Sequence, residues 1–263
     1  MLYHLKLFIQ LKIAFLRGRF NYKLNFFMEM VGNLLAVLLW LFSIYMIINR
    51  YGEFKNWNFS MILFVVALFS ISWSLASMIC IHLSSLVTEV RNGNYTNYML
   101  KPTSSLFFYC ASQFPIRTIG DFLSSLILLV WSITIIPIDF SVMDILFLTI
   151  SVIGGIATIS GSFIINGSMA FLNIDTSMSF VNIFSKLRDM SRFPLFIYPE
   201  YLQGFLLSIV PYGLVAYYPI SSIIFEKKRT ILLYFTPCIG FGYLALSIIL
   251  WKYMEKKYEA TGS

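Results

Sequence analysis

Long apolar segments separated by short polar connections make up most of this chain. The hydrocarbon core of a bilayer is about 30 Å thick, so a helix that crosses it needs roughly 20 apolar residues. Backbone groups in lipid must bond to one another, which favours helices. Six segments approach or meet this requirement: 24–49, 61–86, 120–136, 145–172, 201–220 and 231–251. The pattern predicts an all-α polytopic membrane protein.

Before the first apolar segment, residues 1–22 alternate apolar and basic positions at near-helical spacing. The apolar ones are Leu2, Leu5, Phe8, Ile9, Ile13, Phe15 and Leu16, with Lys6, Lys12, Arg17 and Arg19 between them. This pattern predicts an amphipathic helix in the cytoplasmic interface of the membrane. A frayed basic leader is the alternative. A cleavable signal peptide is disfavoured, because the apolar run at 24–49 is much longer than the usual 7–15 residues.

One stretch has two interpretations. Residues 173–199 are too polar for a clear span and too apolar for an ordinary loop. They could form an amphipathic connection that leads into a span at 201–220, as hydropathy favours, since charges inside a membrane are costly. Alternatively they hold a fifth span, followed by a segment that enters the outer leaflet and returns, broken at Pro211 and Pro219. Such breaks persist only where protein or water covers the backbone.

Charge placement predicts the orientation. The net charge is +7, and basic residues concentrate before the first apolar segment and after the last one. Positive charge beside a span keeps that side in the cytoplasm. The connection at 136–145 carries Asp139 and Asp144 without a base, which suits the outside. Lys227, Lys228 and Arg229 conflict with this topology, but an even number of crossings places both basic termini in the cytoplasm.

Composition supports the same class. Hydrophobic residues are 59% of the chain and charged residues 12%, against about 25% charged in a soluble domain. The basic residues lie at membrane borders, so nucleic acid is not an expected partner. The three cysteines, Cys80, Cys110 and Cys238, form no C-x-x-C pair, which disfavours a disulfide or zinc framework.

Motifs for catalysis are missing from the sequence. It contains no G-x-x-x-x-G-K-[ST] loop, no H-E-x-x-H and no G-x-S-x-G, so nothing indicates a nucleotide site, a zinc protease or a serine hydrolase. We therefore expect no enzyme activity, and no cofactor or metal bound by this chain.

Three ionisable residues near span ends are candidates for a gate or an ion pair: Glu29, Arg117 and Asp121. Ionisable residues within membrane helices are functional candidates by default. Arg117 and Asp121 are four residues apart, so on one helix they share a face and can pair. Either they form a polar gate, or they form a packed pair that fixes the depth of the helix.

The most specific motif follows the second apolar segment, where residues 88–103 read TEVRNGNYTNYMLKPT. Further motifs are RFPLFIYP at 192–199, IVPYG at 209–213 and AYYP at 216–219. In these motifs, their order and their spacing, the chain resembles membrane subunits of type 2 ABC exporters, particularly a bacterial branch of six-span permeases of about 260 residues. Asn94 and Lys101 depart from the residues usual there, an aspartate and an arginine.

The resemblance implies six spans at about 24–49, 61–86, 112–136, 145–172, 174–193 and 231–251, with an external re-entrant segment at 198–222. Its turns would be marked by Pro194, Pro199, Pro211 and Pro219. The connection would couple to a cytoplasmic ATPase through Glu89, Arg91, Asn92, Gly93, Tyr95, Tyr98, Leu100, Lys101 and Pro102. Tyr95, Tyr98 and Leu100 would be the anchors of a helix-in-groove contact.

The same resemblance implies the partners. Two copies of an ABC ATPase, which hold ATP and Mg, and a second, non-identical permease would complete the transporter in the bacterial cytoplasmic membrane, in contact with membrane lipid. The alternative is an ion- or proton-coupled secondary transporter that works without an ATPase. Inverted internal repeats would favour that alternative, but the two halves of the chain show no clear correspondence. An intramembrane enzyme lacks its catalytic residues.

Overall fold

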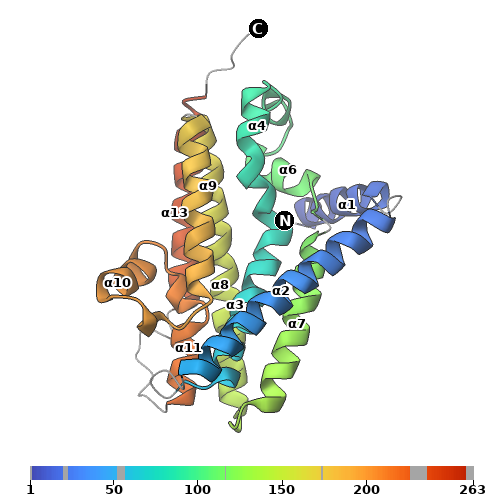
Figure 1. Ribbon diagram of the computed structural model, residues 1–263. Helices are drawn as coiled ribbons and strands as arrows, with labels where there is room; N and C mark the ends of the chain where they lie inside the picture. The colour runs from blue at the N-terminus through green and yellow to red at the C-terminus, as the bar shows by residue number, and fades with distance from the viewer. Residues whose placement is uncertain are drawn as a thin grey trace.

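The computed structural model describes residues 2–19, 23–51, 57–115, 117–172, 174–225 and 236–258. These residues form helices and connections, with no strand among them. The long helices are α2 (Lys23–Tyr51), α3 (Phe59–Cys80), α7 (Arg117–Ile135), α8 (Val142–Ser168), α9 (Ile174–Ser191) and α13 (Thr236–Glu255). Successive long helices run in opposite directions, while α2 crosses the bundle diagonally and α1 (Leu2–Arg19) lies across it (Figure 1).

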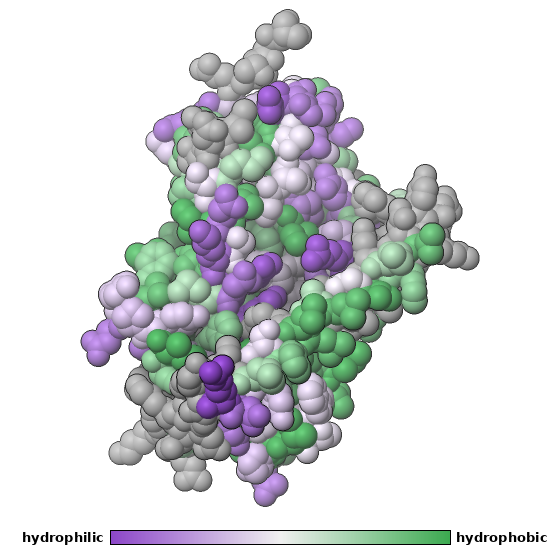
Figure 2. Space-filling model, viewed as in Figure 1, coloured by the Kyte–Doolittle hydropathy of each residue, from purple (hydrophilic) through white to green (hydrophobic). Residues whose placement is uncertain are grey.

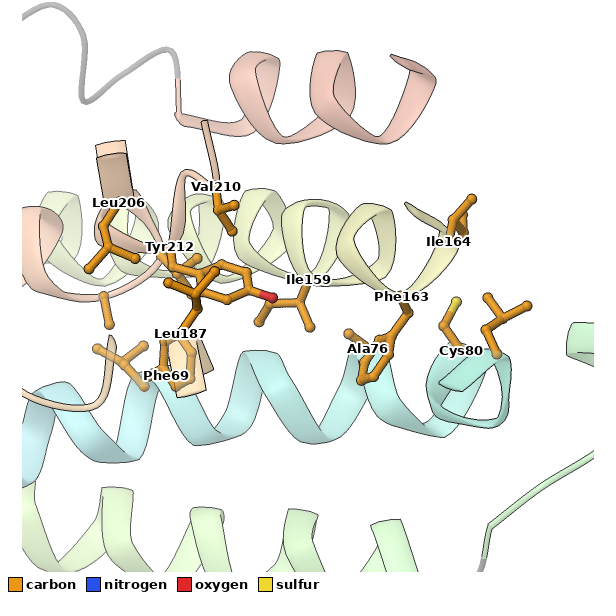
Figure 3. Packing of buried hydrophobic residues seen from close by; sticks show 14 of the residues in the cluster. Phe69, Ala76, Cys80, Ile159, Phe163, Ile164, Leu187, Leu206, Val210 and Tyr212 are labelled. Carbon is orange, nitrogen blue, oxygen red and sulfur yellow. The ribbon is translucent and has the colours of Figure 1, made fainter. Parts of the chain in front are cut away.

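The core forms where α8 packs between α3 and α13. On α3, side chains are buried around almost the whole helix, from Ile62 to Cys80. Figure 3 shows Phe69 and Ala76 of α3 beside Ile159 and Phe163 of α8, with the ring of Tyr212 lying next to Phe69. A helix that is apolar all round is typical of the centre of a helical bundle.

Small residues allow α8 and α13 to approach closely. A Cβ added to Gly240 of α13 would overlap the carbonyl oxygen of Gly154 on α8. Likewise, a Cβ on Gly161 would lie 2.8 Å from the ring of Tyr243. Close backbone contact of this kind is typical of membrane helix pairs.

Four helical stretches are long and apolar enough to cross a membrane: Phe59–Arg91, Arg117–Ile135, Val142–Phe171 and Thr236–Glu255. A shorter apolar run, Leu35–Met46, lies within α2. The more polar α9 carries Lys186, Arg188 and Asp189 and is not among the four. The described part of the chain is thus all-helical, with four candidate spans.

Helix bounds differ by a few residues from the expected spans, as two examples show. The third span was expected over 112–136, but Ser112 ends a separate short helix, α6 (Ser105–Ser112), and α7 begins at Arg117. The last span was expected over 231–251, whereas α13 continues to Glu255. Residues 226–235 lie outside the described part of the chain.

Between α9 and α13, the chain turns repeatedly through short helices. They are η3 (Leu195–Ile197), α10 (Glu200–Ser208), η4 (Tyr212–Leu214) and α11 (Tyr217–Ile224). Pro194, Pro199 and Pro211 each immediately precede one of them, and Pro219 lies in the first turn of α11. Proline is tolerated at helix starts, where its missing N–H has no intrahelical partner. One continuous helix over 201–220, the simpler hydropathy interpretation, is therefore not formed.

Candidate functional site

The connection that follows α3 forms a compact hairpin, residues 86–103, at one end of the bundle. The chain continues from α3 through η1 (Ile81–Ser85) and α4 (Leu86–Arg91), reverses at residues 92–95 and enters α5 (Thr96–Met99). Gly93 has φ +72°, a left-handed conformation that glycine adopts without steric cost. In Figure 1 this hairpin lies at the same end of the bundle as the end of α13.

Tyr95 holds the hairpin to the end of α13. Its hydroxyl donates a hydrogen bond to the Glu255 carboxylate, and the Ser105 hydroxyl donates to the same oxygen. The Tyr95 side chain is completely buried, with its ring 5.0 Å from that of Phe171 and 5.4 Å from that of Tyr258. Burial raises the pKa of the Tyr95 phenol well above its usual range, with the hydrogen bond to Glu255 adding to the effect.

The other expected anchors occupy different positions on the hairpin. Tyr98 is partly buried, with its ring 4.9 Å from that of Tyr109. Leu100 is 79% exposed, and Met99 beside it is 44% exposed. Arg91, Asn92, Lys101 and Pro102 are exposed, whereas Glu89 and Gly93 are partly buried. The outward surface of the hairpin is therefore centred on Leu100, while Tyr95 faces inward, which sequence reasoning did not foresee.

Lys12 connects α1 to α3 and to the segment that follows α6. Its ammonium donates hydrogen bonds to the carbonyl oxygens of Met78, at 3.1 Å, and Gln113. It also lies 5.3 Å from the centre of the Phe114 ring. Burial lowers the pKa of Lys12 to about 8. The sequence showed this lysine only as one basic residue of an interfacial helix; its position among apolar neighbours was the available signal.

A second candidate site is a cavity of about 410 Å³ between α2, α3, α7 and α9. Its charged lining residues are Arg117, Asp121, Arg188, Asp189 and Arg192. Figure 2 shows hydrophilic residues gathered in the middle of this face of the molecule. The structure thus places the predicted pair, Arg117 and Asp121, in one cavity with Arg188 and Asp189 of α9 and with Arg192, which directly follows α9. Glu29 lies on α2, and its side chain is outside the described part of the structure.

Contacts within the cavity orient Arg188. Its guanidinium forms an ion pair with Asp189 at 2.8 Å and lies 5.2 Å from the centre of the Trp73 ring. Arg192 lies within electrostatic reach of Arg188, Asp189 and Asp121. The sequence located these charges, but not that they line a cavity with those of α7. Among the described residues, no group of His, Cys, Asp and Glu is arranged to hold a metal ion.

The apolar helices and their packing define a multi-pass membrane protein. Residues 34–262 match the family model described as ABC-2 family transporter protein. The chain therefore belongs to the ABC-2 transporter family, and it is a transmembrane permease of the ABC transporter class. No curated protein and no solved structure matches it significantly.

Proposed function

We propose that this chain is the permease subunit of an ABC exporter, forms half of the translocation path and is driven by a separate cytoplasmic ATPase. The single observation that carries this proposal is the hairpin at 86–103 within a permease of this family. It presents Met99 and Leu100 outward from the end of the bundle. Exposed apolar side chains on short helices are the kind of anchor that a groove on a partner protein binds.

The proposed membrane arrangement has six crossings, with α2 and α9 added to the four candidate spans. Support for α2 comes from its apolar run Leu35–Met46, and support for α9 from its packing along α8. Because α9 carries charges that lipid would not tolerate, its polar surface requires cover from water or protein. A second permease, identical or not, supplies that cover in this proposal, and the translocation path lies at the seam between them.

The short helices between α9 and α13 would form the re-entrant segment of this arrangement. Neither α10 nor α11 is long enough to cross a bilayer. The buried side chains of Tyr212, Leu214 and Val215 pack this segment onto the bundle. Protein cover of this kind is what permits irregular backbone at membrane depth.

Coupling would run through two contacts in series. The exposed side of the hairpin docks on the ATPase, one copy for each permease, in which ATP and Mg bind. Tyr95, Ser105 and Glu255 connect the hairpin to α13. A displacement imposed by the ATPase would therefore move α13, and through the close α8–α13 contact it would move the centre of the bundle.

The experiment is truncation of the hairpin anchors. Tyr98→Ala with Leu100→Ala should reduce ATPase co-purification about tenfold, because loss of anchor residues commonly costs about 1–4 kcal/mol. Leu100→Ala alone separates docking from folding, since Tyr98 also packs on Tyr109 while Leu100 is exposed. Val142→Ala is the matched control: Val142 is 75% exposed and begins a helix at the other end of the bundle.

Co-purification and substrate-stimulated ATP hydrolysis in reconstituted vesicles are the measurements. Unchanged ATPase binding by the Leu100→Ala protein would remove the hairpin from the coupling contact. Transport by the purified chain alone, without ATP or any ATPase, would reject the permease proposal in favour of a secondary transporter.

A further inference from the structure

The cavity between α2, α3, α7 and α9 has an excess of positive charge. Its described lining includes three guanidinium groups, from Arg117, Arg188 and Arg192, and two carboxylates, from Asp121 and Asp189, so its formal charge is +1. The guanidinium group has a planar fork of donors that matches phosphate and carboxylate oxygens. The charge balance and the donor chemistry both favour an anion with several oxygen acceptors.

Fixed contacts prepare one of these arginines for binding. The Arg188 side chain is held by its ion pair with Asp189 and by the face of the Trp73 ring. A guanidinium that is oriented before the ligand arrives loses less conformational entropy on binding. It also keeps donors beyond those used by Asp189, because guanidinium has five N–H groups.

Two serines add acceptors on the opposite wall. The hydroxyls of Ser124 and Ser125 line the cavity and donate to the carbonyl oxygens of Asp121 and Phe122, at 3.0 and 2.8 Å. Their hydrogens are therefore engaged, and the oxygen lone pairs can accept from a hydroxyl of a ligand. An anionic group that also carries hydroxyls suits this combination.

Apolar surface adjoins the charged wall. Val37 of α2, Val66 of α3 and Leu128 of α7 line the same cavity. Leu35, Leu38 and Leu39, each more than half exposed, continue the apolar surface of α2 around the helix from Val37. A ligand whose headgroup lies in the cavity can therefore place an acyl chain against α2, whereas a soluble anion has no apolar part to occupy that surface.

We infer that this cavity binds the headgroup of an acidic, hydroxyl-bearing phospholipid, which is the substrate class of the permease. The assignment rests on the proposed function. It places the phosphate on Arg188, with Arg117 and Arg192 nearby, the headgroup hydroxyls at Ser124 and Ser125, and the acyl chains against α2.

Lipid binding to the purified chain tests the assignment without any ATPase. The probe is a fluorescent phosphatidylglycerol added to the full-length protein in phosphatidylcholine nanodiscs, with unlabelled phosphatidylglycerol, phosphatidylcholine and inorganic phosphate as competitors. Phosphatidylglycerol should displace the probe at a concentration about tenfold or more below that of phosphatidylcholine, since the latter lacks net charge. Equal displacement by both lipids would overturn the assignment. Displacement by inorganic phosphate as efficient as by phosphatidylglycerol would replace the lipid with a soluble anion.

Variants of α9 give opposite expectations, which separates binding from misfolding. Arg188→Gln should weaken probe binding about tenfold, through loss of a charge-assisted contact. Asp189→Asn removes a negative charge that repels the anion but keeps an amide oxygen that can accept from Arg188, so it should tighten binding about threefold, a result that misfolding cannot produce. Lys186→Gln is the matched control, because Lys186 is exposed on the same helix but does not line the cavity. A similar loss in all three proteins would overturn the assignment.

The failure of this inference is distinguishable from that of the proposed function. If the ATPase co-purifies with the natural protein and less with the hairpin variants, but no headgroup is preferred, the chain would be an ABC permease of another substrate class. Headgroup binding by a chain that transports without ATP would instead retain the site and reject the ATPase coupling.

Discussion

At the scale of single residues, one carboxylate joins segments that are far apart in the chain. Glu255 accepts hydrogen bonds from Tyr95 and Ser105, which lie 160 and 150 residues before it. Leaving a buried polar group without its partner costs roughly 1–3 kcal/mol. The position of the hairpin therefore depends on hydroxyl groups that a pattern of apolar residues would not identify.

Removing the Tyr95 hydroxyl tests this dependence. Tyr95→Phe keeps the buried ring but deprives Glu255 of a donor, so the protein should lose about 1–2 kcal/mol of stability and some coupling of ATP hydrolysis to transport. Tyr253→Phe is the control, because Tyr253 is 55% exposed on the same helix as Glu255. Thermal unfolding in detergent and the ratio of transport to ATP hydrolysis are the measurements. Identical values for the two variants would show that the hydroxyl has no role in fixing the hairpin.

The lowered pKa of Lys12 predicts a particular dependence of the protein's stability on pH. Burial lowers its pKa from 10.5 to about 8 in the folded protein, so between these values the unfolded chain binds more protons. The Lys12 contribution to stability should therefore rise with pH through this window and stay constant below it. Relative to the natural protein, Lys12→Met should become progressively less stable from pH 8 to pH 10. Unfolding midpoints of both proteins, measured across that range, check this, and parallel curves would contradict it.

At the scale of helices, the contact between α8 and α13 sets a steric limit. Gly240 meets the backbone of Gly154, whereas a Cβ added to Gly242, two residues further along α13, would meet nothing within 4 Å. The two glycines of one helix therefore differ only in what they face. Such a contact cannot relax easily, because backbone atoms form both sides of it.

Alanine substitution at Gly240 and at Gly242 measures how much stability is lost when a side chain is added at the close contact between α8 and α13. Gly240→Ala should destabilise the protein by roughly 1–3 kcal/mol through overpacking, while Gly242→Ala should be neutral or slightly stabilising, since alanine favours helix. Unfolding midpoints of the purified proteins in detergent give the comparison. Equal stability of the two variants would mean that the helices separate at little cost.

Sequence patterns predicted most of the long helices, but few of the contacts between them. Apolar runs located α3, α7, α8 and α13, because a bilayer imposes length and hydropathy on each helix separately. The break of 201–220 was less accessible from hydropathy, since Pro211 and Pro219 signal it only weakly within an apolar segment. The inward position of Tyr95 was not accessible, because it depends on partners in α13 and α6. The charged cavity required knowing that α7 and α9 face each other.

At the scale of the whole molecule, the alternating directions of the long helices give a topology. The hairpin and the end of α13 lie at one end of the bundle, and the connection between α7 and α8 at the other (Figure 1). From the charge distribution, we propose that the first end faces the cytoplasm. With α9 as a crossing, α10 would then lie toward the outside.

Single-cysteine labelling tests this topology. In a background without Cys80, Cys110 and Cys238, an impermeant thiol reagent should label cysteines at Asp139 and Glu200 in intact cells. It should leave a cysteine at Asn97 unlabelled until the cells are opened. All three positions are exposed in the folded chain, so protection reflects the membrane rather than burial. Labelling at Asn97 in intact cells would show that the orientation is the opposite of the proposed one. Protection at Glu200 would place α10 on the cytoplasmic side.

The contact of Tyr95 with Glu255 also orders events during protein synthesis. A ribosome makes the hairpin 160 residues before it makes Glu255, so the hairpin exists as a sequence long before it can be held in place. An ATPase that recognises its folded shape would thus bind only permeases whose α13 has already been made. The final turn of α13 would then keep chains that still lack it out of assembled transporters.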